Sequence, residues 1–185
     1  FFFGEQGMND SFDLDPDGKT HHDAMWSSSL SGAAGAGMQW HWSTYLNKFD
    51  LYRHYTGLSK FTAGEDWPAR AWKPAKTTRP SQPVQLRVYG LVAEDRALLW
   101  IHDPLAFRVI QKAAQKGPSV TGASLNVAGL AEGAYRVEFV DTASGEVLNR
   151  DAQPVRPSRH FGHGIELNPP EFWGDIAVRI TRREK

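Results

Sequence analysis

The second half of the chain alternates apolar and polar residues with a period of two, which is typical of strands with one buried face. The alternation is clear over 84–88 and 135–139, whereas 97–101 is a continuous apolar run of the kind expected in a central strand. Frequent Gly and Pro residues separate these segments. Three shorter strands are predicted, at 146–148, 165–167 and 176–180. Many short strands joined by turns predict an antiparallel β-sandwich.

The first part of the chain has a mixed pattern. An apolar strand is predicted at 1–3, and a helix rich in small residues at 22–37. A second strand is predicted at 38–42, followed by a helix over 46–61 with apolar residues at helical spacing. Strand, helix, strand and helix in this order are typical of parallel βα units.

The segment between the two parts is rich in Pro and small polar residues, which favour an extended and exposed path. We predict a linker at 73–83, a first domain at 1–72 and a second domain at 84–185. The chain opens directly on the apolar strand, so we expect further residues to precede Phe1 in the complete gene product.

Composition narrows the possible functions. The 185 residues include 41% hydrophobic residues and carry a formal net charge of zero. A nucleic-acid-binding protein needs a basic surface, and an anionic membrane offers no attraction to a neutral chain, so neither is expected as a partner. The chain has no Cys, which excludes disulfides and thiolate metal sites. Seven Trp, ten Phe and five Tyr provide large core side chains or platforms for stacking on sugars.

The opening residues, Phe2-Phe3-Gly4-Glu5-Gln6-Gly7, resemble the end of strand seven in retaining (β/α)8 glycosidases of the cellulase-like type, glycoside hydrolase family 5 and its clan. The stretch 22–42 resembles their helix-seven to strand-eight region. Segments of the second half resemble the β-sandwich that some of these enzymes add at the C-terminus, namely 95–101, 129–137, 141–145 and 174–178. The resemblance spans nearly the whole chain.

This resemblance implies the last two βα units of a (β/α)8 barrel followed by an antiparallel β-sandwich. The implied activity is retaining hydrolysis of a β-linked polysaccharide or oligosaccharide, with Glu5 as the nucleophile. Catalytic groups of such barrels lie at the C-terminal ends of strands, where Glu5 would lie. A retaining enzyme needs a second carboxyl about 5–5.5 Å away. In the family it ends strand four, which would precede Phe1, so we expect this chain to be incomplete and inactive without its N-terminal portion.

Four further residues are predicted to contact substrate. In the family a Trp near the end of strand eight lies under the sugar, and strand alternation would place Trp40 and Trp42 on one side with Trp42 nearer the substrate. The alternative is that both indoles belong to the core. His22 and Trp26, on the predicted small-residue helix, are candidate sugar contacts, with a capping or loop role as the alternative for His22.

Metal and cofactor sites are not expected. The segment from Asp13 to Gly18 begins like a calcium-binding loop, but Ala24 stands where the closing acidic residue would fall, so an Asp-rich turn is favoured. There is no H-E-x-x-H motif for zinc, and His160 with His163 is a weak pair. Secretion or a periplasmic location is inferred from the substrate class alone.

A second reading of the function remains open. The chain would then be a non-catalytic carbohydrate-binding or structural β-sandwich attached to an inactive barrel remnant. Phe172 and Trp173 would stack on a sugar in that case, or seal the sandwich against the barrel.

Overall fold

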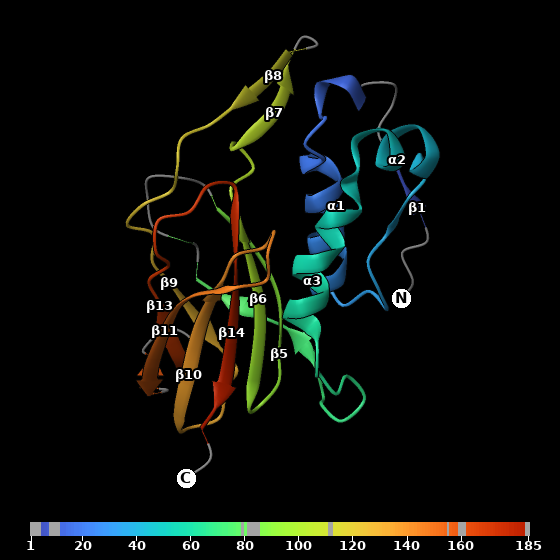
Figure 1. Cartoon of the computed structure of the whole chain (residues 1–185). Coiled ribbons are helices and arrows are strands. Elements are labelled where there is room, and N and C mark those ends of the chain that lie inside the picture. Colours follow the sequence, from blue (N-terminus) through green and yellow to red (C-terminus); the bar gives the residue numbers. More distant parts are fainter. Residues whose placement is uncertain are drawn as a thin grey trace.

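The structure is a computed structural model and describes residues 5–7, 12–78, 80, 86–110, 113–154, 156–158 and 162–183. The strand predicted at 1–3 and His160 lie outside the described residues. Helices gather in the N-terminal part and antiparallel sheets in the rest (Figure 1), which confirms the mixed helical and β content predicted from the sequence.

Two antiparallel sheets contain most of the strands in the described part of the chain. The larger has the strand order β11-β10-β14-β6-β5-β3, and the smaller β12-β13-β9-β4. The larger sheet contains β3 (Lys73–Pro74), β5 (Arg87–Val92), β6 (Arg96–His102), β10 (Ala134–Val140), β11 (Val147–Pro154) and β14 (Asp175–Arg182). The smaller contains β4 (Lys76–Thr77), β9 (Leu125–Ala128), β12 (Arg156–Ser158) and β13 (Gly162–Leu167). The hairpin of β7 (Phe107–Ile110) and β8 (Ala113–Lys116) stands apart from both.

The two sheets share one apolar core. Leu99 and Val137 of the larger sheet and Val127 and Ile165 of the smaller belong to a single cluster of buried side chains. Each of these four residues is at most 1% exposed. Burial of this apolar surface is the main favourable contribution to holding the sheets together.

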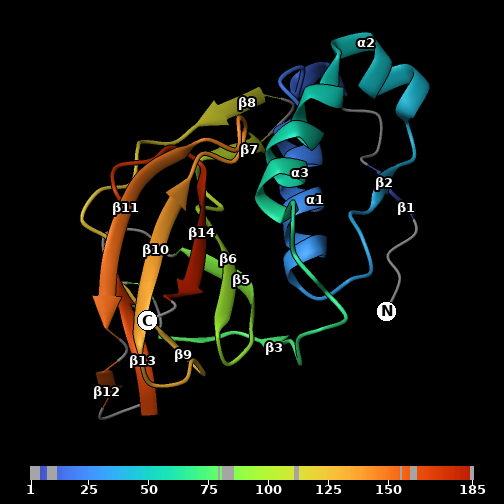
Figure 2. The same ribbon diagram turned by 60° about the horizontal axis from the view of Figure 1, so that its bottom comes forward.

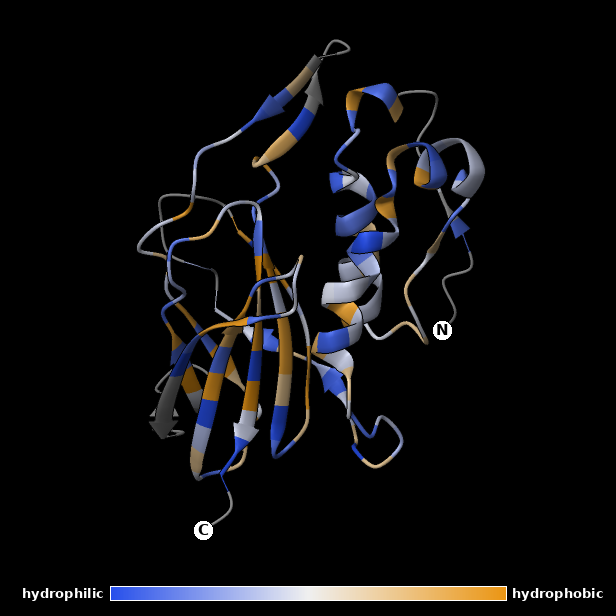
Figure 3. Cartoon of the chain, in the orientation of Figure 1, coloured by the Kyte–Doolittle hydropathy of each residue, from blue (hydrophilic) through white to orange (hydrophobic). Residues whose placement is uncertain are grey.

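At its central strand β6 the larger sheet is buried on both faces. Along β6, Ala97, Leu99 and Ile101 contribute to the core shared with the smaller sheet. Leu98 and Trp100, which point the other way, pack with the helices in a second cluster. The apolar run predicted as a central strand therefore is one, and it needs no polar positions because both of its faces are buried. The larger sheet carries hydrophobic residues along its central strands (Figure 3).

The first long helix, α1, spans Lys19–Leu30 and not the predicted 22–37. Asp15 sets its beginning, because the two carboxylate oxygens accept hydrogen bonds from the backbone N–H groups of Lys19 and Thr20, both at 2.8 Å. The helix ends before Gly32, whose φ of 88° lies in the left-handed region that glycine tolerates best. The Gly-rich stretch after Ser31 thus forms a loop and not the last turns of a helix.

The strand predicted at 38–42 is shorter in the structure. β2 contains only Met38–Gln39, and a π-helix, η2, follows at Trp42–Leu46. Period-two alternation therefore does not extend to Trp42, and the expectation that strand geometry places Trp40 and Trp42 on one side was wrong. Tyr45 and Leu46 of this turn are buried, so packing outweighs the β preference of the sequence here.

The second predicted helix is divided. A short α2 (Asn47–Phe49) and a 3-10 turn η3 (Leu51–Arg53) lead into α3 (His54–Thr62). The break lies at Asp50, a non-glycine residue with a positive φ of 50°. Together α1 and α3 cover the outer face of the larger sheet (Figure 2). Among the described residues no helix has both the length and the apolarity to cross a bilayer.

A short parallel pair precedes these helices. β1 (Glu5–Gln6) pairs with β2 in parallel, with Glu5 opposite Met38 and Gln6 opposite Gln39. The chain between them carries the 3-10 turn η1 (Phe12–Leu14) and α1. A strand, a helix and a parallel strand thus follow one another as predicted, but β1 lies just after the predicted strand 1–3.

The predicted linker at 73–83 is partly built into the sheets. β3 pairs with β5 of the larger sheet, and β4 pairs with β9 of the smaller. Its remaining described residues are Ala75, Thr78 and Pro80. The segment therefore crosses from one sheet to the other within five residues. It is extended, with Lys73, Pro74 and Lys76 exposed as expected, but it is paired with both sheets and is not a free connection.

Candidate functional site

The parallel pair presents a carboxylate and two indoles to solvent. Glu5 is exposed, and Trp40 and Trp42 are 61% and 56% exposed. Met38, opposite Glu5 in the pairing, is 57% exposed as well. Apolar side chains this open within five residues form a patch of the kind that marks a binding surface.

Gly7, the last residue of the segment Gly4-Glu5-Gln6-Gly7, lies at a position with little room for a side chain. A Cβ atom at this position would lie 3.2 Å from Gln39 Oε1, 3.2 Å from the His41 ring and 3.5 Å from Trp40 Cβ. Such contacts are tight, so glycine lets the segment after β1 approach the segment after β2. Gly7 and Trp40 consequently lie close together just after the C-terminal ends of the two paired strands, and Glu5 lies two residues before Gly7.

Trp26 lies elsewhere. It is completely buried in the cluster between α1, α3 and the larger sheet, with its ring centroid 5.2 Å from that of Phe61. A side chain without exposed surface cannot stack on a substrate, so its position fits a core role. Its indole N–H has no hydrogen-bond partner among the described residues.

His22 is buried at the contact between α1 and β14. Its Nε2 lies 2.8 Å from Asp175 Oδ2, and its Nδ1 lies 3.2 Å from His54 Nδ1. His54 Nε2 donates to the Asp17 carbonyl at 2.7 Å, so His54 Nδ1 is the acceptor and His22 Nδ1 the donor. Asp175 also accepts the Trp100 indole N–H at 2.5 Å. In this hydrogen-bond pattern His22 donates from Nε2 to Asp175 and from Nδ1 to His54.

Lys19 completes this buried charge network. Its ammonium group pairs with Asp23 and lies 3.6 Å from Asp175 Oδ1. Burial opposes the charged form of Lys19, but the two carboxylates prevail and raise its pKa. For Asp175, burial would raise the pKa, yet His22 and Lys19 hold it far below its usual range. Sequence reasoning missed Asp175, because His22 and Lys19 precede it by more than 150 residues and no local motif marks it.

Three residues of this network are grouped like the ligands of a metal ion. His22, Asp23 and Asp175 offer ligand atoms that all lie within 4.8 Å of one another. Lys19 already contacts both carboxylates, and His22 donates its Nε2 proton to Asp175. The positive charge at this position is thus supplied by the protein, and the residues do not fit a resident cation.

Three histidines around this network are neutral. Burial is the main reason why the pKa values of His21, His54 and His102 are lowered to about 4. Neighbouring positive charges lower these pKa values further. His21 is fully buried, and neither of its ring nitrogens has a partner among the described residues. Burial also raises the pKa of Asp23 to about 6.

The Asp-rich segment before α1 behaves as a turn. Asp15 is buried and accepts backbone N–H groups of α1 and the Tyr45 hydroxyl at 2.8 Å. Asp13 pairs with Lys48, and Asp17 lies 3.5 Å from Lys116 Nζ. The carboxylates are directed at separate partners, which agrees with the turn and not with a calcium loop.

Phe172 and Trp173 differ from each other. Phe172 is 7% exposed and belongs to the core between the sheets. Trp173 is 40% exposed, donates its indole N–H to the Gly117 carbonyl at 3.0 Å and has Lys116 Nζ 5.6 Å from its ring centroid. This indole is held beside the β7–β8 hairpin.

Comparison with known proteins adds little. No protein-family model matches the chain, and no curated protein matches it significantly in sequence. Among solved structures, the chain is similar to α-L-fucosidase isoenzyme 2 from Paenibacillus thiaminolyticus, with 13% identity and a TM-score of 0.35. The match covers 77% of this chain and 18% of the fucosidase, so the chain spans less than a fifth of that protein. A likeness of this size establishes neither a fold nor an activity.

Proposed function

We propose that this chain is the C-terminal portion of a retaining glycoside hydrolase that acts on a β-linked polysaccharide or oligosaccharide. The segment 5–72 would supply the last two βα units of a (β/α)8 barrel, and the two antiparallel sheets its appended β-sandwich. Glu5 would be the nucleophile, with Trp42 and Trp40 as the sugar platform.

One observation carries this proposal. An exposed carboxylate lies in β1, and two exposed indoles follow β2, the parallel strand that is connected to β1 through a helix. In barrels of parallel strands the reacting groups lie at the C-terminal ends of the strands, and Trp40 directly follows the C-terminal end of β2. An indole face matches the C–H face of a pyranose, and a carboxylate beside it is placed to attack the anomeric carbon.

The open edges of the parallel pair support the barrel interpretation. Among the described residues β1 and β2 pair only with each other. An isolated two-stranded sheet is marginal in water, and purely parallel sheets are normally covered on both faces. Further strands of the same protein would cover Met38 and would carry the acid/base carboxyl.

The chemistry follows from these roles. Glu5 would attack the anomeric carbon and form a glycosyl-enzyme ester while the acid/base carboxyl protonates the leaving oxygen. Water would then hydrolyse the ester, with the same carboxyl acting as base. The proposed substrate is therefore a carbohydrate, the second partner is the N-terminal part of the protein, and a secreted or periplasmic location is proposed from the substrate class.

The test is covalent labelling of the protein produced from its complete reading frame. A slowly hydrolysed, 2-fluorinated β-glycoside should leave a glycosyl adduct on the peptide that contains Glu5. Glu5→Gln should abolish both the adduct and turnover, whereas Glu166→Gln, at an exposed position of β13, should change neither. An adduct on another carboxylate, or full activity of Glu5→Gln, would refute the assignment.

A further inference from the structure

A groove lies between the helices and the edge of the larger sheet. It has a volume of about 980 Å³ and is bounded by the loop after α1, by α3 and by the segment that leads into β3. Its size reaches the upper end of the usual range for ligand pockets. The groove does not include Glu5, Trp40 or Trp42.

Aromatic side chains form one wall of this groove. Trp67 is 39% exposed, and its ring centroid lies 5.5 Å from that of Trp72. Tyr55, Leu58 and Leu91 extend the apolar lining. The Trp72 indole N–H is buried without a partner among the described residues.

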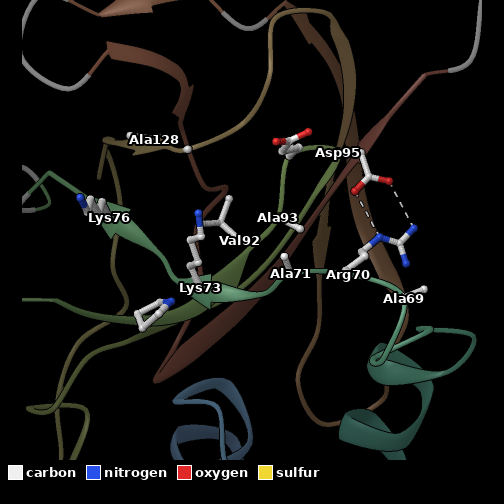
Figure 4. Close-up of a pocket in the computed structure, with 12 residues that line it drawn as sticks. Ala69, Arg70, Ala71, Lys73, Lys76, Val92, Ala93, Asp95 and Ala128 are labelled. Atoms are coloured by element: carbon white, nitrogen blue, oxygen red, sulfur yellow. Dashed lines mark hydrogen bonds and ion pairs between the residues drawn. The ribbon is translucent and has the colours of Figure 1, made fainter.

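The wall that carries Trp67 is fixed by ion pairs on both sides. Before it, Glu65 pairs with Arg96 of β6. After it, Arg70 donates from Nε and Nη2 to the two carboxylate oxygens of Asp95, at 3.2 and 3.3 Å (Figure 4). The backbone N–H of Trp72 also donates to the Arg70 carbonyl at 2.9 Å. The indoles are therefore held in place before any ligand binds, which lowers the entropy cost of binding.

The remaining lining is hydroxylated and uncharged. Ser29, Ser31 and Ser59 line the groove, and their hydroxyl groups make no hydrogen bond within the described part of the chain. Lys, Arg, Asp, Glu and His are absent from the described lining. Small residues of the loop after α1, among them Ala34, leave the entrance wide.

From these features we propose that the groove is a second, non-catalytic binding site for a neutral oligosaccharide segment. Trp67 stacks on a pyranose face, and the three free hydroxyl groups bond to sugar hydroxyls. The ligand class follows from the complementarity of charge: a neutral polyhydroxylated chain loses no ionic hydration in a lining without ions. The site also extends the proposed function, because it would hold a polysaccharide away from the cleavage point.

Other occupants fit the lining less well. An acyl chain would bury the serine hydroxyl groups without partners, at a free-energy cost for each. A charged peptide or an acidic polysaccharide would find no counter-ion in the groove, and burial of its charge would be unfavourable.

The test is calorimetric titration of the full chain with cello-, xylo-, manno- and laminarihexaose. At least one should bind, and Trp67→Ala should weaken it by about tenfold or more, as truncation of a central aromatic anchor does. Ala34→Arg removes no packing contact of the core and should weaken binding through its size and charge. Tyr52→Ala, an exposed aromatic residue of η3 outside the groove, is the matched control and should bind normally.

Two results would overturn the proposal. One is no binding of any of the four hexasaccharides. The other is unchanged binding by both Trp67→Ala and Ala34→Arg. Glu5→Gln separates this site from the proposed active site, because it should leave groove binding intact even though it abolishes labelling. If the unaltered protein binds an oligosaccharide in the groove but is not labelled at Glu5, the proposed function has failed. If it is labelled at Glu5 but Trp67→Ala and Ala34→Arg bind normally, the groove proposal has failed.

Discussion

At the scale of single residues, Asp175 is the centre of the polar network beneath α1. Its carboxylate accepts hydrogen bonds from His22 and Trp100 and faces the Lys19 ammonium, and its side chain is 6% exposed. A buried pair of this kind contributes little beyond a hydrophobic substitute, but loss of one partner leaves a charge without compensation.

We therefore expect Asp175→Asn to destabilise the protein by about 3 kcal/mol, the cost of breaking a buried ion pair. The amide removes the negative charge and leaves Lys19 and His22 with less compensation. Urea unfolding followed by tryptophan fluorescence at pH 7 measures the change. Asp50→Asn is the control, because Asp50 is exposed and asparagine tolerates its positive φ. Equal stability of both variants would argue against a central role for Asp175.

The histidines predict how stability depends on pH. His21, His54 and His102 have folded pKa values of about 4 against a usual 6.5, so the unfolded chain binds more protons between these limits. The contribution of these three histidines to the free energy of unfolding should be fully present above pH 6.5. It should be lost as the pH drops toward 4. The raised pKa of Asp23, about 6, has the opposite effect, because here the folded chain binds more protons than the unfolded chain. It offsets the pH dependence contributed by one of the three histidines.

His21→Leu should reduce this pH dependence. Leucine fits a fully buried site without polar partners and removes one proton-binding group from the unfolded state. The slope of unfolding free energy between pH 6.5 and 4.5 should become shallower, while stability at pH 7 stays the same or rises. A slope as steep as that of the wild type would contradict the assignment.

At the scale of elements, α3 packs tightly on the turn between β10 and β11. A Cβ atom at Gly57 would lie 1.8 Å from the Thr142 carbonyl oxygen. In an exposed helix an alanine in place of glycine is stabilising by about 1 kcal/mol. Here the clash with rigid backbone should outweigh that gain.

Gly57→Ala should therefore lower the melting temperature, against the usual helix preference. Thr56→Ala, at the neighbouring exposed position of the same helix, should leave it unchanged or raise it slightly. Differential scanning calorimetry of the two variants gives the comparison. A more stable Gly57→Ala would show that α3 is not seated against this turn.

Element types were easier to predict than element ends. The apolar run at 97–101 and the alternation at 135–139 identified β6 and β10, because burial fixes their periodicity. The beginning of α1 depends on the Asp15 carboxylate, which accepts a hydrogen bond from the backbone N–H of Lys19. The end of β2 depends on the burial of Tyr45. The local sequence does not distinguish Trp26 from Trp67, yet Trp26 is buried in the core and Trp67 is 39% exposed. Tertiary packing decides such cases, and no local pattern reports it.

At the scale of the whole molecule, the helices and the larger sheet depend on each other. Leu98, Trp100, Val140 and Ala177 of the sheet are covered by Trp26 and its neighbours on α1 and α3. The boundary predicted at 73–83 therefore separates two segments that share a core.

A fragment of residues 73–185 should consequently expose an apolar face and self-associate. Light scattering and binding of a hydrophobic dye should both be higher than for the full chain. Replacement of Leu98 and Val140 by Thr in the fragment should reduce association, since the new hydroxyl groups face water there. A monomeric fragment with weak dye binding would show that the sheets are complete without the helices.

The segment that forms β3 and β4 also has a mechanical consequence. Because it pairs with one sheet at Lys73 and with the other at Lys76, it acts as a tether across their shared edge. A pull on the helical segment relative to the sheets would load these two-residue strands first. They would release a few hydrogen bonds at a time, so the chain should yield at this corner long before its larger sheet is sheared.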